Sequence, residues 1–327
     1  MRAKLSVASG AGTAPRTSNL EAYSQYLIGK QLRSRNSEDG FRRAGEAFRR
    51  AIALDPSFAP AYADLSFCET ILSRNNIEML NARDDADRAI ELAPTMVDGY
   101  LARAYARLNG LLDFEGARRD VDKALLLNPN ATDVWRRHGH LLATFGRLSE
   151  AIASEKKALE LDPLSGFAWD YLGTYLSANG QYEEARHAFR RELELVPDAS
   201  ETIQINLGTI DLLDMKPQQA LLRFQATQDE LTRNTGIAMA EHSLGHAETS
   251  ERAVSDAVAR FREKAPYRIA MMYAWLGDKE KAFASLDLAY AQREGLLAQI
   301  KFEPLLASLR KDSRFGELLH RLNLPEE

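Results

Sequence analysis

Small apolar and aromatic positions recur along this chain at fixed distances from a series of prolines, while the positions between them are mostly charged or polar. The prolines are Pro56, Pro94, Pro129, Pro163 and Pro197, at intervals of 38, 35, 34 and 34 residues. Alanine stands twelve residues before each proline, at Ala44, Ala82, Ala117, Ala151 and Ala185. A period near 34 residues predicts a tandem array of similar helical units.

Two further columns keep the same phase. A second alanine lies five residues before four of the prolines, at Ala51, Ala89, Ala124 and Ala158. An aromatic residue lies six after the first four prolines, at Tyr62, Tyr100, Trp135 and Trp169. The two alanines of a unit are seven residues apart and share one helical face, so a neighbouring helix can approach closely there. Proline ends the second helix of each unit because it cannot continue it. We therefore predict antiparallel helix pairs with the aromatic column in the core.

The best-kept unit contains Trp169-x-x-Leu172-Gly173, then Ala185-x-x-x-Phe189, then Pro197. This run, together with the 34-residue period, resembles the signature of the tetratricopeptide repeat. The resemblance implies an all-α fold, a right-handed α-solenoid of antiparallel helix pairs, and a role in binding other proteins. We expect a disordered leader over residues 1–18, about eight helix pairs over residues 19–299, and C-terminal capping helices over residues 300–327.

The later units keep the phase after the proline column fades. Gly208 and Gly245 each precede an alanine by twelve residues, as Gly173 does, and Ala270 replaces the glycine in the last unit. The interval from Gly245 to Ala270 is only 25 residues, about nine short of the period. From this we predict an early end to the helix before Pro266 and an altered stacking angle.

Both ends of the repeat region have a more specific resemblance. Residues 18–27 and 51–62 are similar to the opening, and residues 305–315 and 318–325 to the ending, of repeat regions in bacterial signalling proteins. Those proteins carry winged-helix transcription activators, class III adenylate cyclases or serine/threonine kinases in their N-terminal halves. The sequence has neither a glycine-rich phosphate loop nor a kinase catalytic-loop motif. The resemblance implies a regulatory or partner-binding module, either independent or cut from such a protein.

Composition narrows the function further. The net charge of −5 argues against a nucleic-acid surface, since phosphate binding depends on excess lysine and arginine. The longest apolar run, residues 269–276, is shorter than the ~20 residues of a membrane span. We expect a cytoplasmic protein, or a periplasmic one if its parent is tethered to a membrane. Its partner is expected to be a protein or peptide.

One pair of residues in the sequence has the spacing of metal ligands. His242 and His246 are four residues apart on a predicted helix, which would place both on one face. Ser243 occupies the position where a metalloprotease motif has glutamate, and two ligands leave a zinc site half built. Carboxylates alternate with lysine and arginine, and no pair stands out as an acid and a base. We therefore expect no catalytic residue, no metal and no cofactor, and not an enzyme.

The same columns predict a partner-binding groove, because the resemblance implies that the first helix of each pair lines the concave surface. Positions immediately after the aromatic and glycine columns point to that surface. Phe67 and Tyr105 have two interpretations: they anchor a partner, or they fill a tight superhelix. The predicted groove residues are Tyr26, Lys30, Phe67, Leu101, Tyr105, Arg136, His140, Asp170, Thr174, His242 and His246.

Overall fold

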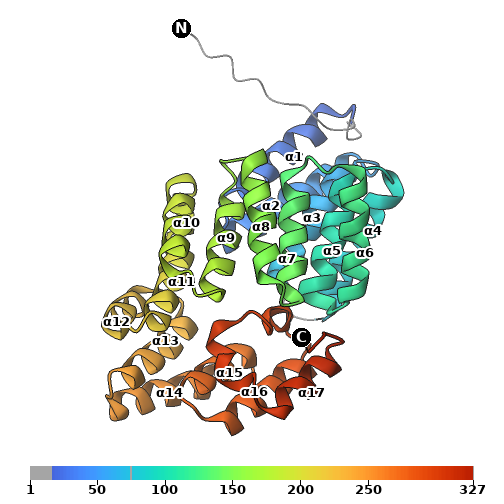
Figure 1. Cartoon of the computed structure of the whole chain (residues 1–327). Coiled ribbons are helices and arrows are strands. Elements are labelled where there is room, and N and C mark those ends of the chain that lie inside the picture. Colours follow the sequence, from blue (N-terminus) through green and yellow to red (C-terminus); the bar gives the residue numbers. More distant parts are fainter. Residues whose placement is uncertain (1–16, 74–75, 327) are drawn as a thin grey trace.

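A computed structural model describes residues 17–73 and 76–326 of the chain. Every regular element in these residues is helical, and no strand occurs among them. The predicted leader over residues 1–18 lies outside the described residues, apart from residues 17 and 18. The helices follow one another as an all-α solenoid (Figure 1).

The described residues form eight successive helix pairs. The first four pairs are α1 (Leu20–Arg33) with α2 (Glu38–Leu54), α3 (Ala59–Leu72) with α4 (Asn76–Leu92), α5 (Val97–Ala106) with α6 (Phe114–Leu127), and α7 (Thr132–Thr144) with α8 (Leu148–Leu161). The next four are α9 (Gly166–Ala178) with α10 (Tyr182–Leu195), α11 (Ser200–Leu213) with α12 (Pro217–Ala226), α13 (Glu230–Ser243) with α14 (Ala247–Phe261), and α15 (Pro266–Trp275) with α16 (Lys279–Ala291). A π-helical turn, η1 (Arg107–Leu111), extends α5, and a short 3₁₀ turn, η2 (Pro197–Ala199), precedes α11.

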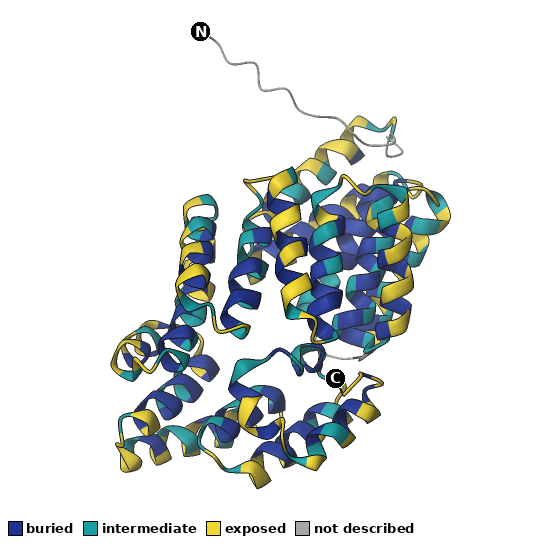
Figure 2. Ribbon diagram, in the orientation of Figure 1, coloured by how far each residue is buried: buried dark blue, intermediate teal, exposed yellow. Residues whose placement is uncertain are grey.

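The alanine columns hold the helices of a pair together. All nine alanines of the two columns are completely buried, including Ala151 and Ala158. A methyl group at these positions lets the helix axes approach closely, and larger side chains fill the space on either side. Figure 2 shows the result, with buried residues facing neighbouring helices and exposed residues on the outer sides.

The aromatic column packs against the predicted core but lies at its edge, not inside it. Its side chains are half-buried, and each donates a hydrogen bond to the carbonyl oxygen of the proline six residues earlier. The indole Nε1 of Trp135 lies 2.7 Å from the Pro129 oxygen, and that of Trp169 lies 3.0 Å from the Pro163 oxygen. The constant spacing therefore reflects a hydrogen bond that closes the turn between successive pairs and gives the carbonyl of the turn proline a partner.

The seventh pair corrects one prediction about register. Gly245 has a φ of +80° and lies in the turn between α13 and α14, as Gly180 and Gly277 do in their own pairs. The equivalent of the helix-internal Gly173 is the buried Ala238, seven residues before Gly245. The turn glycines Gly245 and Gly277 are 32 residues apart, which is close to the period. The predicted nine-residue shortage and early helix end are therefore wrong, because the prediction treats the turn glycine Gly245 as equivalent to the helix-internal Gly173.

The C-terminal residues cover the last pair with less regular structure than the predicted capping helices. Two 3₁₀ segments, η3 (Gly295–Gln299) and η4 (Pro304–Leu309), precede α17 (Ser313–Arg321). Side chains three apart eclipse in a 3₁₀ helix, so the fully buried Leu306 and Leu309 both point into the core beside α15.

The same segment also returns to the middle of the solenoid. The helix η3 contacts η1 and α7, and Gly295 lies so close to Asn109 that a Cβ there would collide with the Asn109 carbonyl oxygen. The ring of Phe302 meets the ring of Tyr175 on α9 edge-on, with centroids 5.7 Å apart. Residues 295–305 therefore bridge the last pair and the central pairs, and they border the concave side of the solenoid (Figure 1).

Candidate functional site

The concave side contains a cavity of about 370 Å³. The first helices of six successive pairs, from α5 to α15, contribute side chains to its lining, and residues 296–305 form another part of it. This volume is within the range of ligand-binding pockets, and it is too small to hold a whole folded domain.

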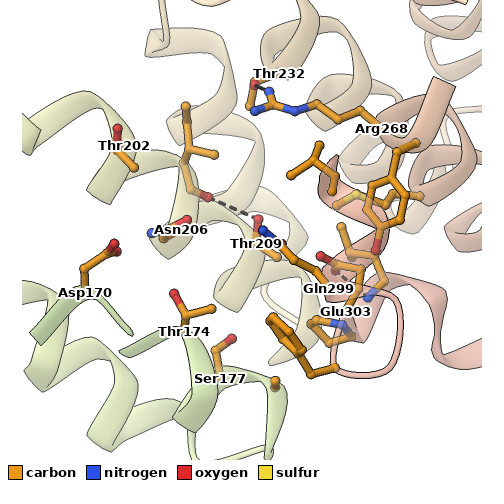
Figure 3. A pocket seen from close by; sticks show the side chains of 18 of the residues that line it. Asp170, Thr174, Ser177, Thr202, Asn206, Thr209, Thr232, Arg268, Gln299 and Glu303 are labelled. Atoms are coloured by element: carbon orange, nitrogen blue, oxygen red, sulfur yellow. Dashed lines mark hydrogen bonds between the residues drawn. The ribbon is translucent and has the colours of Figure 1, made fainter. Parts of the chain in front are cut away.

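Two helices present rows of small polar side chains to this cavity. Figure 3 shows Asp170, Thr174 and Ser177 on α9, and Thr202, Asn206 and Thr209 on α11. Both rows have the spacing i, i+4 and i+7, which places the residues on one helical face. No hydrogen bond from the side chains of Thr174, Thr202 or Asn206 is found among the described residues. These groups are therefore available to a ligand.

Aromatic rings form much of the remaining wall. The rings of Tyr171 and Tyr175 lie 5.8 Å apart, and Tyr171 is 5.4 Å from the ring of His140. The hydroxyl groups of Tyr175 and Tyr267 are buried and have no hydrogen-bond partner in the part of the chain that the structure describes. A buried hydroxyl without a partner costs about 1–3 kcal/mol, so a ligand that reaches it would recover part of that energy.

Charged side chains give the cavity an acidic character. Burial raises the pKa of Asp170 to about 6, against the opposing effect of the Arg136 guanidinium. Burial likewise raises the pKa of Glu303 to about 6, although its carboxylate accepts a 2.9 Å hydrogen bond from the Leu305 amide. Arg268 donates to the Thr232 hydroxyl at 2.7 Å.

A second cavity of only about 50 Å³ lies in the N-terminal half of the concave side. Lys30 and Arg33 pair there with the buried Asp64, at 3.6 and 3.2 Å. Phe67 and Arg136 also line it, and both are less than a tenth exposed. In this half, the protein's own side chains fill most of the concave surface.

The predicted groove residues separate into three groups. Tyr105, His140, Asp170 and Thr174 line the larger cavity. Lys30, Phe67, Leu101 and Arg136 line the smaller one. The remaining three, Tyr26, His242 and His246, line neither cavity.

These three residues have other surroundings. The ring of Tyr26 packs on Phe48 and Phe58, with centroids 5.8 and 5.0 Å away. His242 is in the last turn of α13 and His246 follows the turn at Gly245, so the predicted placement on one helix is wrong. Both are exposed, and His246 Nδ1 lies 2.6 Å from Glu241 Oε2.

The register error in the seventh pair explains why its two predicted residues line no cavity. Moving the two histidine positions seven residues back gives Thr235 and Met239, and both line the larger cavity. The sequence had no comparable signal for residues 296–305, because they lie beyond the repeats and reach the cavity only through the return of the chain.

Among the described residues there is neither a candidate metal-binding cluster nor a helix that could span a membrane. No group of three or more histidine, cysteine, aspartate or glutamate side chains there could hold a metal ion. None of the helices in those residues has the length and apolar character needed to cross a membrane.

Comparison with known proteins gives one family match. A family model described as tetratricopeptide repeat matches residues 156–187, which run from the end of α8 through α9 into α10. No curated protein sequence gives a significant match.

Several solved structures share the fold. A chain of the APC/C hetero-tetramer Cut9-Hcn1 is similar over 94% of this chain and 57% of that one, with a TM-score of 0.62 and 17% identity. This chain therefore spans little more than half the length of that relative. A monomeric IFIT1 mutant with Gppp-AAAA is similar over 83% of this chain and 71% of that one, with a TM-score of 0.57 and 14% identity.

A tetratricopeptide repeat protein from Parabacteroides merdae ATCC 43184 is similar over 80% of this chain and 99% of that one, with a TM-score of 0.51 and 13% identity. Identities this low concern the fold alone. The fold, the spacing of the alanine and proline columns, and the family match lead to one conclusion: this chain is an all-α helical-repeat solenoid that contains a tetratricopeptide repeat at residues 156–187.

Proposed function

We propose that this protein is a scaffold that binds a segment of a partner protein in the larger cavity on its concave side. The observation that carries the proposal is the convergence of side chains from six successive first helices and from residues 296–305 on one cavity. Repeat solenoids of this kind bind protein partners, and their curvature creates one continuous surface from many units.

The lining residues are better suited to bind a polypeptide segment than to bind the flat surface of a folded protein. The polar rows on α9 and α11 offer hydroxyl and amide groups to a backbone, and the aromatic wall offers apolar area to side chains. A volume of about 370 Å³ has room for a few side chains of a segment. The resemblance of the chain ends to bacterial signalling proteins makes a regulatory protein the first class of partner to test.

A photo-cross-linking experiment tests this location. Thr209, which faces the cavity, and Leu222, which is 64% exposed on the paired helix α12, are each replaced by p-benzoylphenylalanine in the full chain. We expect Thr209 to form an adduct with one defined segment of a partner, identified by mass spectrometry, and Leu222 to form none with that segment. Adducts of the same partner from Leu222 but not from Thr209 would place binding on the convex surface and refute the proposal.

A further inference from the structure

The carboxyl group of Asp170 has no fixed partner on the wall of the larger cavity. It points into the space between α9 and α11 (Figure 3) and forms no hydrogen bond or ion pair with the described residues. Glu192 on α10 is fully buried, and burial followed by the charge of Asp170 raises its pKa. Of these two carboxyl groups, Asp170 is the one that lines the larger cavity.

The positive groups near the cavity are engaged elsewhere. Arg136 pairs with Asp133 and lies over the rings of Phe167 and Tyr171, at 4.9 and 5.5 Å from their centroids. Its charge stabilises that of Asp170 from a distance, but no hydrogen bond joins the two side chains in the described structure.

The other two basic side chains are similarly occupied. Arg268 donates to Thr232 and lies 3.3 Å from Asp229. His140 is 3% exposed, and burial together with the nearby Arg137 lowers its pKa to about 3, so its imidazole is neutral at pH 7. None of these groups neutralises Asp170 by direct contact.

The remaining walls suit a cation and disfavour an anion. Glu303 is on the side formed by η4 and adds a second carboxylate to the lining (Figure 3). The rings of Tyr171 and Tyr175 present aromatic surface, which attracts ammonium and guanidinium groups. The buried Tyr175 and Tyr267 hydroxyls, which have no partner among the described residues, can accept hydrogen bonds from such a group.

We infer that the larger cavity selects a partner segment with a lysine or arginine side chain, and that Asp170 is the counter-ion of that side chain. The inference rests on the proposed function, since it specifies the chemistry of the segment that the cavity binds. Desolvating a carboxylate is costly unless a cation compensates it, so a neutral side chain in the same place would leave Asp170 unpaired. An acidic side chain would be repelled by Asp170 and Glu303.

The test uses the full chain and fluorescein-labelled decapeptide pools, each fixed at one position as arginine, lysine, citrulline or glutamate. Citrulline has the shape of arginine without its charge. Fluorescence polarisation should show about tenfold tighter binding of the best arginine or lysine pool than of the matching citrulline pool. Asp170→Asn should remove that preference, and Glu184→Gln, which neutralises an exposed carboxylate on α10, should keep it. Circular dichroism and melting temperature check that both variants are folded.

The outcomes separate this inference from the function on which it rests. If peptide pools bind but citrulline equals arginine, the basic side chain is refuted while groove binding stands. If Asp170→Asn keeps the preference for arginine or lysine, Asp170 is refuted as the counter-ion. If no pool of any composition binds, both fall. Spermidine is the competing probe for a free cation: tight binding of spermidine that depends on Asp170, without any preference among pools, would assign the site to a small amine instead.

Discussion

The ring of Phe67 on α3 stacks on the ring of Tyr105 on α5, with centroids 5.0 Å apart and planes 21° apart. The guanidinium of Arg33 lies 4.9 Å from the Phe67 ring centroid, and that of Arg137 lies 4.0 Å from the Tyr105 centroid. Protein groups thus cover both outer faces of the stacked pair. Of the two interpretations that the sequence allows, this packing favours a structural role for Phe67 and leaves Tyr105 at the border of the larger cavity.

Phe67→Ala is therefore expected to destabilise the protein. Removing a buried phenylalanine typically lowers the free energy of unfolding by about 3–5 kcal/mol, through lost burial and a residual cavity. Urea unfolding followed by circular dichroism measures the change. Tyr23→Ala, at a position that is 43% exposed on α1, is the control and should change stability far less. A fully stable Phe67→Ala protein that has lost its partner would instead support a direct binding role.

Gly295→Ala should disrupt the return of the C-terminal segment. The added methyl group would collide with the Asn109 carbonyl oxygen, and a backbone atom cannot move aside as a flexible side chain can. Overpacking typically costs about 1–3 kcal/mol. Thermal unfolding should show a lower melting temperature, with faster hydrogen exchange in η1 and η3. In the control Gly316→Ala, the nearest atom to the new methyl group is 3.5 Å away, and stability should hardly change. Equal melting temperatures for both variants would contradict the tight contact at Asn109.

Asp211→Ala should be one of the most damaging single changes to the repeat array. The buried Asp211 carboxylate accepts hydrogen bonds from Arg186 on α10 and from Arg223 Nε on α12, the latter at 2.7 Å. Removing one member of a buried charge network typically costs about 3–5 kcal/mol, because the other members lose their compensation. Chemical unfolding gives the size of the loss. The exposed pair of Glu115 and Arg118 is the comparison, since Glu115→Ala should cost less than about 1 kcal/mol.

His140 should make stability depend on pH. Its pKa is about 3 in the folded protein because of burial and the charge of Arg137, against about 6.5 in an unfolded chain. The unfolded state therefore takes up a proton as pH falls below 6.5, while the folded state stays neutral. The contribution of His140 to the free energy of unfolding is therefore full above pH 6.5 and is lost progressively between pH 6.5 and pH 3. At pH 5 the loss is about 2 kcal/mol.

The substitution His140→Gln removes this titration, so its stability should fall less than that of the parent between pH 7 and pH 5. His187→Gln, which removes an exposed imidazole on α10, is the matched control and should follow the parent. Urea unfolding at several pH values measures both. Parallel curves for His140→Gln and the parent would mean that the imidazole is not held neutral in the folded protein.

The repeat architecture could be predicted from sequence because it depends on contacts between residues close in the chain. The helices of a pair meet through alanines such as Ala151 and Ala158, and the partner helix follows within one repeat. The same local logic selected Asp170 and Thr174, which line the larger cavity. It failed in the seventh pair, because glycine serves both in turns with positive φ and in close helix contacts, and composition does not separate the two uses at Gly245.

Tertiary structure alone decided where the concave side is open. Whether Phe67 fills the superhelix or faces a partner depends on rings and guanidinium groups from other pairs, which no periodic pattern encodes. The border of the larger cavity depends on Gly295 meeting Asn109, a contact between residues 186 positions apart. The small rotation between neighbouring pairs accumulates along the solenoid. Its sum determines whether the C-terminal segment comes close enough to contact the central pairs. Local sequence therefore specifies the unit, while the accumulated curvature and the returning C-terminal segment shape the site.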